Sequence, residues 1–205
     1  YFDETVKEMI TKGIAMKAAW QTTFLARAGK PVLMFIDEPA LAGLGSSAFI
    51  SVATEDIQVI INEAAETIHK AGGLAGIHVC ANTDWGLLLS SKIDILSFDA
   101  YGFFDRISPL QQELRTFLER GGTIAWGGIP TSRDEDIQQE TVKSLANLWN
   151  SQMETIAGTN YSKKDLLRQS IITPSCGTGS LSPELAHRVL ELTRGVAMEL
   201  RNQHL

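Results

Sequence analysis

The sequence predicts an α/β fold on a parallel sheet, because short apolar runs alternate with helix-like segments five times along its 205 residues. The apolar runs are continuous rather than alternating, which is typical of strands buried on both faces. Aspartate, histidine or cysteine residues, which can act in catalysis or bind a metal, lie at the carboxyl ends of four of the five runs. In a TIM (β/α)8 barrel these carboxyl ends of the strands converge on one face, where active sites are built. The three observations together favour a barrel.

An open doubly wound sheet is the alternative α/β fold, and it usually carries a glycine fingerprint at its ligand crevice. No G-x-G-x-x-G stands between the first strand and its helix, and no G-x-x-x-x-G-K-[ST] occurs. A closed barrel needs eight strands and typically about 250 residues. The predicted fold is therefore an incomplete TIM (β/α)8-type barrel of about five C-terminal strand–helix units, forming one catalytic domain over residues 1–205.

The missing strands leave the nature of the chain open. We expect three strands to precede Tyr1, because a long helix as first element fits a chain that begins partway around a barrel. The chain is then a fragment, a truncated form, or a half that pairs with something else. An open barrel would expose sheet edges and apolar helix faces, so we expect self-association of the isolated chain.

The elements of the first half are predicted from helical periodicity and from stop signals. Gly29-Lys30-Pro31 ends the first helix, and Gly72-Gly73 ends the second. Thr54, followed by two acids, opens the second helix. A loop rich in glycine, alanine and serine is predicted over 40–52. The expected helices cover 5–28, 54–70 and 84–91, and the expected strands cover 32–36, 74–79 and 93–98.

The second half continues the alternation of strands and helices. Gly121-Gly122 ends one helix, and Ser182-Pro183-Glu184 gives the last helix a cap, a proline in its first turn and an early acid. The expected helices cover 109–120, 135–156, 163–168 and a final segment from 183 almost to 205. The expected strands cover 123–126 and 170–173.

The two cysteines offer the sharpest functional hypothesis. Cys80 ends the strand that also carries His78, and Cys176 follows the last strand. A thiolate is a strong zinc ligand, and His-x-Cys can supply two ligands from one strand end. If Cys176 meets His78 and Cys80 in the fold, the chain holds a metal. The alternative is that both cysteines are ordinary core residues, while a disulfide between them is not expected in a reducing compartment.

Composition excludes several classes of function. Hydrophobic residues make up 44% and charged residues 20% of the chain, as in ordinary globular domains. The net charge of −6, without a basic run, argues against nucleic acid as a partner. No apolar stretch approaches the roughly 20 residues that span a bilayer. Without a signal peptide or a disulfide framework, we expect a reducing cytoplasm as the location.

Four motifs resemble one enzyme superfamily, in its order and across nearly the whole chain. The motifs are Phe35-Ile36-Asp37-Glu38-Pro39-Ala40-Leu41, Gly76-Ile77-His78-Val79-Cys80, Asp94-Ile95-Leu96-Ser97-Phe98-Asp99 and Thr173-Pro174-Ser175-Cys176-Gly177. With them the chain resembles the C-terminal catalytic barrel of cobalamin-independent methionine synthase, whose relatives include uroporphyrinogen decarboxylase and the corrinoid methyltransferases.

The resemblance implies roles for five residues. His78, Cys80 and Cys176 fall on the family's zinc ligands. Asp99 falls where methionine synthases usually place a glutamate ligand, which is one methylene longer. Asp37 falls on the carboxylate that holds the amino group of homocysteine. No catalytic acid or base is assigned, and the early-barrel elements of the family that complete its substrate pocket have no counterpart in this chain.

The resemblance implies a zinc-dependent methyltransferase of methionine biosynthesis, which activates a homocysteine-like thiol for methyl transfer from a methyltetrahydrofolate-type donor. The alternatives are a corrinoid-dependent enzyme that uses a methylcobamide carried by a protein, a uroporphyrinogen decarboxylase-like enzyme that needs no metal, and a truncated barrel without catalysis. The expected partners are a small-molecule thiol, a methyl donor, and either a second copy of the chain or the missing N-terminal half.

Overall fold

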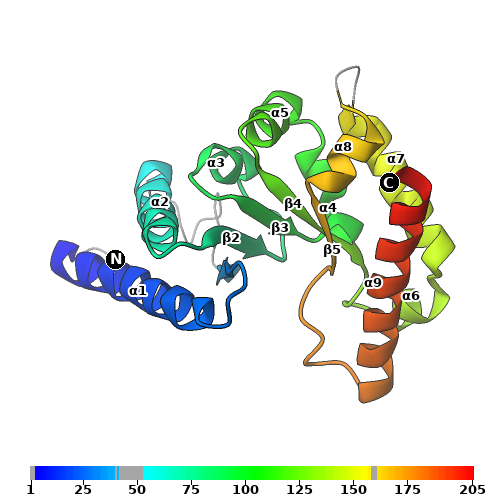
Figure 1. The fold of residues 1–205 in the computed structure, drawn as a ribbon, viewed down its shortest axis with the longest axis horizontal. Coiled ribbons are helices and arrows are strands. Elements are labelled where there is room, and N and C mark those ends of the chain that lie inside the picture. The colour runs from blue at the N-terminus through cyan, green and yellow to red at the C-terminus, as the bar shows by residue number, and fades with distance from the viewer. Residues whose placement is uncertain (1–2, 40, 42–52, 158–160) are drawn as a thin grey trace. The chain divides into compact units, whose positions relative to one another are not determined.

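The computed structural model describes residues 3–39, 41, 53–157 and 161–205. In this part of the chain five strands form one parallel sheet in the order β1-β2-β3-β4-β5 (Figure 1). The strands are β1 Leu33–Asp37, β2 Leu74–Val79, β3 Ile95–Phe98, β4 Thr123–Ile129 and β5 Ser170–Pro174. The predicted α/β class is confirmed, and the sheet is compatible with part of a TIM-like fold. The described residues contain no eight-stranded barrel, so the barrel stays a prediction.

Helices occupy most of the segments between the strands. They are α1 Glu4–Ala26, α2 Thr54–Lys70, α3 Trp85–Ser90, α4 Ala100–Ile107, α5 Gln111–Glu119, α6 Asp134–Gln139, α7 Val142–Ala157, α8 Lys163–Arg168 and α9 Pro183–His204. Each strand was predicted at its place, and Ser182 caps α9 by accepting a hydrogen bond from the amide of Leu185, as expected. The loop predicted over 40–52 lies, except for Leu41, outside the described residues.

Two glycines turn the chain from a helix into the next strand. Gly72 (φ 82°) follows α2 and Gly121 (φ 91°) follows α5, both in the left-handed region that favours glycine. At each of these joints between helix and strand, the residue after the glycine donates its amide hydrogen to a carbonyl oxygen of the helix. The donors and acceptors are Gly73 and Ile68 after α2, and Gly122 and Phe117 after α5. This pattern is the Schellman motif, which satisfies the last carbonyls of a helix. The predicted helix ends at 72–73 and 121–122 are therefore confirmed.

Two predicted helical segments need correction. The chain after β3 forms α4, which was not predicted from the sequence; Asp99 caps it by accepting a hydrogen bond from the amide of Gly102. The single helix predicted over 135–156 is two helices, α6 and α7, separated at Glu140 and Thr141. The break arises because Thr141 and Ser144 cap each other: each hydroxyl accepts a hydrogen bond from the other residue's amide.

The chain folds as two compact units, one formed by Tyr1–His78 with Thr83–Leu96 and the other by Val79–Asn82 with Ser97–Leu205. The prediction of one domain over 1–205 stays a prediction. In the first unit α1 packs on α2, and the two helices are joined by ion pairs from Lys7 to Asp56 (3.1 Å) and from Lys12 to Glu63 (2.6 Å).

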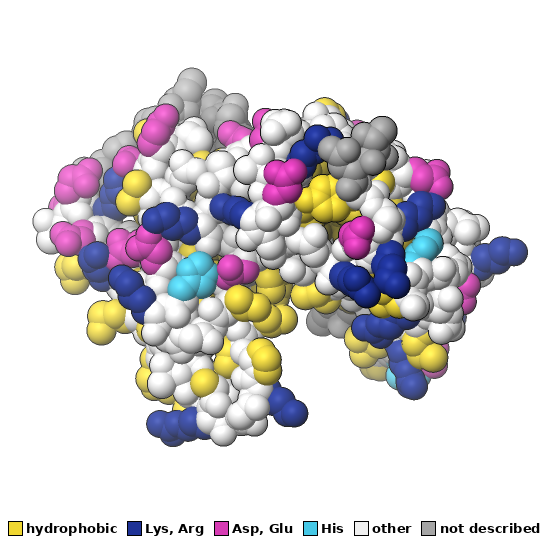
Figure 2. All heavy atoms as spheres, turned by 45° about the horizontal axis from the view of Figure 1, so that its top comes forward, with side chains coloured by type: hydrophobic (Ala, Val, Ile, Leu, Met, Phe, Trp, Pro, Cys, Tyr) yellow, Lys and Arg dark blue, Asp and Glu magenta, His cyan; other side chains and the backbone are white. Residues whose placement is uncertain are grey.

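The first helix buries its small side chains and exposes its large ones. The buried face of α1 consists of Thr11, Ala15, Ala18 and Thr22, which recur at helical spacing. Its large apolar side chains are exposed, and Figure 2 shows such side chains at the surface among lysines and arginines. We name as the α1 apolar stripe the exposed residues Val6, Met9, Ile10, Ile14, Met16, Trp20, Phe24 and Leu25.

The strand β1 is less buried than its sequence predicts. The continuous apolar run indicated burial on both faces, but Leu33 and Phe35 are exposed. The physical reason is position: β1 ends the order of the sheet and pairs with β2 alone among the described strands. Parallel strands at the centre of a sheet, such as β3, are fully buried as expected.

The second unit holds a continuous core around β4 and β5. The helices α7 and α9 pack against each other and onto these strands (Figure 1). Trp126 lies in this core in edge-to-face contact with Phe98, with ring centroids 5.4 Å apart, and its indole N–H donates to the hydroxyl of Ser170 (2.9 Å). This packing joins β4 to the first residue of β5, and the candidate site lies at the opposite, carboxyl end of β5.

Candidate metal centre

The end of β2 presents two of the predicted ligands on one face. Successive residues of a strand point to opposite faces, so His78 and Cys80 share a side while Val79 is buried on the other. His78 and Cys80 are both half-buried. Across the sheet, Asp37 is the register partner of His78, and the amide of Glu38 donates to the carbonyl oxygen of His78 (3.2 Å).

The end of β5 carries the third predicted ligand. Cys176 is exposed, whereas the preceding Ser175 is only 2% exposed. The amide of Ser175 donates to the carbonyl oxygen of Ile129 (2.8 Å), at the end of β4. Its hydroxyl pairs with that of Thr131 at 2.9 Å, in a buried hydrogen bond whose donor could be either group. Neighbouring β4 therefore sets the path of the chain into Cys176.

A register shift brings β4 close to β5 and β3 at this end of the sheet. Gly127 pairs with Thr173 and Ile129 with Pro174, so Gly128 has no counterpart on β5. A β-carbon on Gly127 would lie 2.4 Å from the carbonyl oxygen of Phe98 and 2.8 Å from the Cα of Ser175. Only glycine fits this approach of three strand ends without displacement of backbone.

The three predicted ligands come together. The ligand atoms of His78, Cys80 and Cys176 all lie within 4.8 Å of one another, so this cluster could hold a metal ion. Cys80 and Cys176 belong to the same compact unit, and His78 precedes Cys80 by two residues on the same strand. Neither cysteine is in a disulfide. The predicted convergence of Cys176 on the His-x-Cys strand end is confirmed.

The donor set fits a metal of intermediate softness. Imidazole and thiolate ligands suit zinc, and its ligand atoms lie about 3.5 Å apart when Zn–S is about 2.3 Å and Zn–N about 2.0 Å. Small side-chain rotations would bring the cluster to such separations. Three protein ligands with one exposed member resemble open sites, which keep a position for an exogenous ligand, rather than closed structural sites.

The two predicted carboxylates are not members of the cluster. Asp99 is the N-cap of α4, where its Oδ1 accepts a hydrogen bond from the amide of Gly102 (2.8 Å). Asp37 is exposed at the end of β1, next to His78 in register. Zinc ligation by Asp99 and substrate binding by Asp37 stay predictions.

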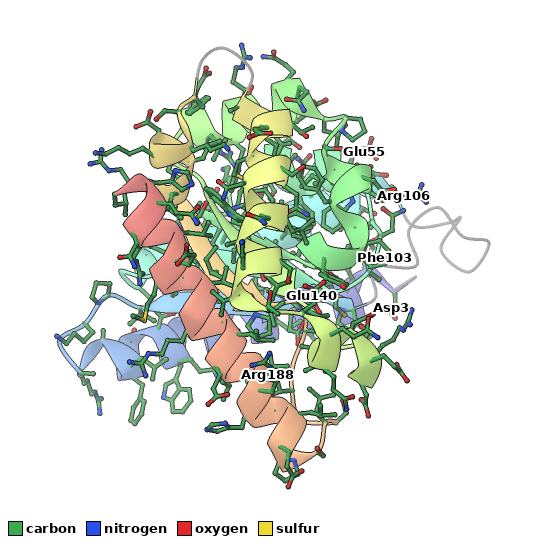
Figure 3. All side chains as sticks on the ribbon, turned by 90° about the vertical axis from the view of Figure 1, so that its right-hand side faces the viewer. Asp3, Glu55, Phe103, Arg106, Glu140 and Arg188 are labelled. Atoms are coloured by element: carbon green, nitrogen blue, oxygen red, sulfur yellow. The ribbon has the colours of Figure 1, made fainter. Side chains whose placement is uncertain are left out.

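A polar network beside α4 was not predicted from the sequence. Tyr101 donates its hydroxyl to Glu140 (3.0 Å), and Arg188 of α9 donates to the backbone carbonyl of Glu140 (2.9 Å); Figure 3 labels Glu140 and Arg188. Burial, and then the neighbouring Glu140 carboxylate, raise the pKa of Tyr101 to about 12. The network holds α4, α9 and the α6–α7 junction together. The only sign of this network in the sequence is the Thr141–Ser144 pair, which marks the junction between α6 and α7.

Thr131 and Gly127 are the other site residues that were not predicted from the sequence. Gly127 lies near the end of β4 and Thr131 follows the strand, and this position was their only signal in the sequence. Nothing in their residue types distinguishes them from ordinary packing.

None of the described helices combines the length and apolarity needed to cross a membrane. No protein-family model and no curated protein matches the chain.

Proposed function

We propose that the chain is a zinc-dependent methyltransferase that activates a homocysteine-like thiol, as in cobalamin-independent methionine synthase. The observation that carries the proposal is the convergence of His78, Cys80 and Cys176, with ligand atoms within 4.8 Å of one another. Cysteines that served only as core residues would not require a histidine beside them, and they would not include the exposed Cys176. The resemblance of four motifs to the methionine synthase barrel supplies the reaction class.

The cluster residues would each contribute one ligand, two sulfurs and one imidazole nitrogen. Bound zinc supplies Lewis acidity, which keeps a coordinated thiol deprotonated at neutral pH. The exposed Cys176 places the cluster at the surface of its unit, where a thiol substrate can enter. The two cysteine ligands carry negative charge, which preserves the nucleophilicity of a sulfur held beside them.

The two carboxylates complete the proposed site. Asp37, in register with His78, would accept hydrogen bonds from the ammonium group of the amino acid substrate. Asp99 is the proposed fourth ligand of the metal. Its Oδ1 accepts the hydrogen bond that caps α4, so the same carboxylate would serve both the helix and the metal.

The first test is the metal content of the purified chain, with wild type beside Cys176→Ser. We expect one zinc per chain in the wild type and its loss in the variant, because a serine hydroxyl does not replace a thiolate as a zinc ligand. His187→Ala is the matched control, since His187 is an exposed histidine on α9 outside the cluster. Zinc that is absent from the wild type, or retained in Cys176→Ser, would contradict the proposed site.

The second test separates the reaction classes. Zinc-loaded protein is incubated with homocysteine and either methyltetrahydrofolate or free methylcobalamin, and methionine is measured. Methionine from the folate supports the proposal as stated. Methionine from methylcobalamin alone assigns the donor to the corrinoid class. If the chain binds zinc but forms no methionine from either donor, the chain alone is a non-catalytic metal-binding barrel fragment.

A further inference from the structure

The loop after β5 presents Cys176 to the other two cluster residues, and a buried pair of hydroxyl groups lies directly behind it. We propose that Thr131 and Ser175 are positioning residues, which hold Cys176 at ligand distance from His78 and Cys80. The inference rests on the metal site of the proposed function, and it concerns residues to which the family resemblance gives no role.

The first observation is the burial of the pair. Thr131 and Ser175 are 7% and 2% exposed, and their hydroxyl oxygens are 2.9 Å apart. A buried hydroxyl that loses its partner is left without a hydrogen bond and away from water, so the pair is favoured over any arrangement that separates the two groups. Ser175 is thereby held to the segment that follows β4.

The second observation is that Ser175 is held in three ways by one segment. Its hydroxyl contacts Thr131, its amide donates to the carbonyl oxygen of Ile129 (2.8 Å), and its Cα packs against Gly127. Backbone, side chain and van der Waals contacts thus all come from residues 127–131. These contacts fix both the position and the orientation of the peptide that leads into Cys176.

The third observation is that Cys176 itself is exposed. An exposed side chain gains little from packing, so the position of its sulfur depends on the backbone that carries it. Outer residues that orient metal ligands typically change metal affinity about 10–100-fold when they are altered. We therefore expect the Thr131–Ser175 pair to act on metal affinity through Cys176, without contacting the metal.

The experiment measures zinc affinity by competition with a chromophoric chelator, using metal-free protein in reducing buffer. Thr131→Val and Ser175→Ala each remove one hydroxyl, and we expect each to weaken zinc binding about 10–100-fold. Thr131→Ser keeps the hydroxyl and should restore affinity to near the wild-type value. Two variants and one conservative replacement keep the test decisive if any single protein fails to fold.

Thr22→Val is the matched control. Thr22 is fully buried in α1, and its hydroxyl donates to the carbonyl oxygen of Ala18 (2.8 Å). Its replacement removes a buried threonine hydroxyl of the same kind, far along the chain from the cluster. We expect a lower unfolding temperature with unchanged zinc affinity.

A second readout needs no metal. Diamide oxidises two nearby thiols to a disulfide and is itself reduced to the hydrazine. It can act on Cys80 and Cys176, because their sulfur atoms lie within 4.8 Å of each other. We expect the intramolecular disulfide to form more slowly in Thr131→Val and Ser175→Ala than in the wild type, and at the wild-type rate in Thr22→Val.

The two readouts separate the possible failures. A wild type that binds no zinc, but whose disulfide formation slows in Thr131→Val, would overturn the metal function and leave the positioning intact. Unchanged zinc affinity and unchanged disulfide formation in both variants, accompanied by a lower unfolding temperature, would overturn the positioning. The hydroxyl pair would then be a packing feature of β4 and β5 alone.

Discussion

Asp37 lies directly opposite His78 in the parallel pairing of β1 with β2. Register partners on adjacent strands are about 4.8 Å apart and project to the same side of the sheet. A carboxylate thus stands beside the first cluster residue without belonging to the cluster. The proposed substrate, homocysteine, carries an ammonium group a few bonds from its sulfur and would be able to reach both.

This relationship predicts a selective effect of Asp37→Asn. The variant should keep its zinc and raise the KM for homocysteine about 10-fold or more, because a hydrogen bond to a charged group contributes about 1.5–3 kcal/mol. The measurement compares homocysteine with 4-mercaptobutyrate, which lacks the amino group. An equal increase in KM for both thiols would show that Asp37 does not bind the amino group.

The crowding around Gly127 predicts contrasting effects at two adjacent glycines. Gly127→Ala should lower the free energy of unfolding by about 1–3 kcal/mol, because its β-carbon would lie 2.4 Å from the carbonyl oxygen of Phe98. Gly128→Ala should be nearly neutral, since a β-carbon there meets no atom within 4 Å. Urea unfolding of both variants measures the difference, and comparable destabilisation by the two would contradict the close approach of the strand ends.

The environment of Tyr101 predicts a change in stability at alkaline pH. Its pKa is raised from the ordinary 10.0 to about 12, so the folded state keeps a proton that the unfolded state has already lost. The free energy of unfolding should therefore fall as pH rises from about 10 to about 12. Tyr101→Phe should remove this contribution, and with it the highest component of the tyrosinate absorbance titration. If Tyr101→Phe instead removed a component that titrates near pH 10, the raised pKa of Tyr101 would be contradicted.

The α1 apolar stripe predicts self-association of the isolated chain. Trp20 and Phe24 are 65% and 52% exposed and stacked on each other, and contiguous apolar surface of this kind favours contact between copies. Light scattering should show species larger than a monomer, and Trp20→Ser should reduce them. Leu190→Ser on α9, where the leucine is 58% exposed, is the control that should leave association unchanged. A clean monomer with a cooperative melt would sink the prediction.

The sequence predicted the strands well because each run is apolar and bounded by strong signals. The Gly72-Gly73 and Gly121-Gly122 pairs mark the strand starts, and polar residues mark the ends. The convergence of the three cluster residues was also predictable, since cysteine and histidine are rare and their place at strand ends limits what they can contact. Asp37 and Asp99 were identified through family resemblance, and their roles stay predictions.

Other features depended on contacts that a single sequence does not reveal. The helix α4 begins at Ala100 and has two weak helix formers, Gly102 and Phe103, in its first turn; the cap from Asp99 favours it. The exposure of Phe35 follows from the place of β1 in the sheet rather than from its own residues. Thr131 gains its importance only from the partner that lies 44 residues further along the chain.

The glycine joints at 72 and 121 have a consequence for engineering this chain. They close the helices at the amino ends of β2 and β4, whereas every proposed ligand and substrate contact lies at or beyond a carboxyl end. The residues that stabilise the helix ends and the residues proposed to bind metal and substrate therefore lie at opposite edges of the sheet. Substitutions in the loops that follow the strands are therefore expected to act on the proposed metal and substrate contacts, whereas substitutions at the two joints are expected to act on stability.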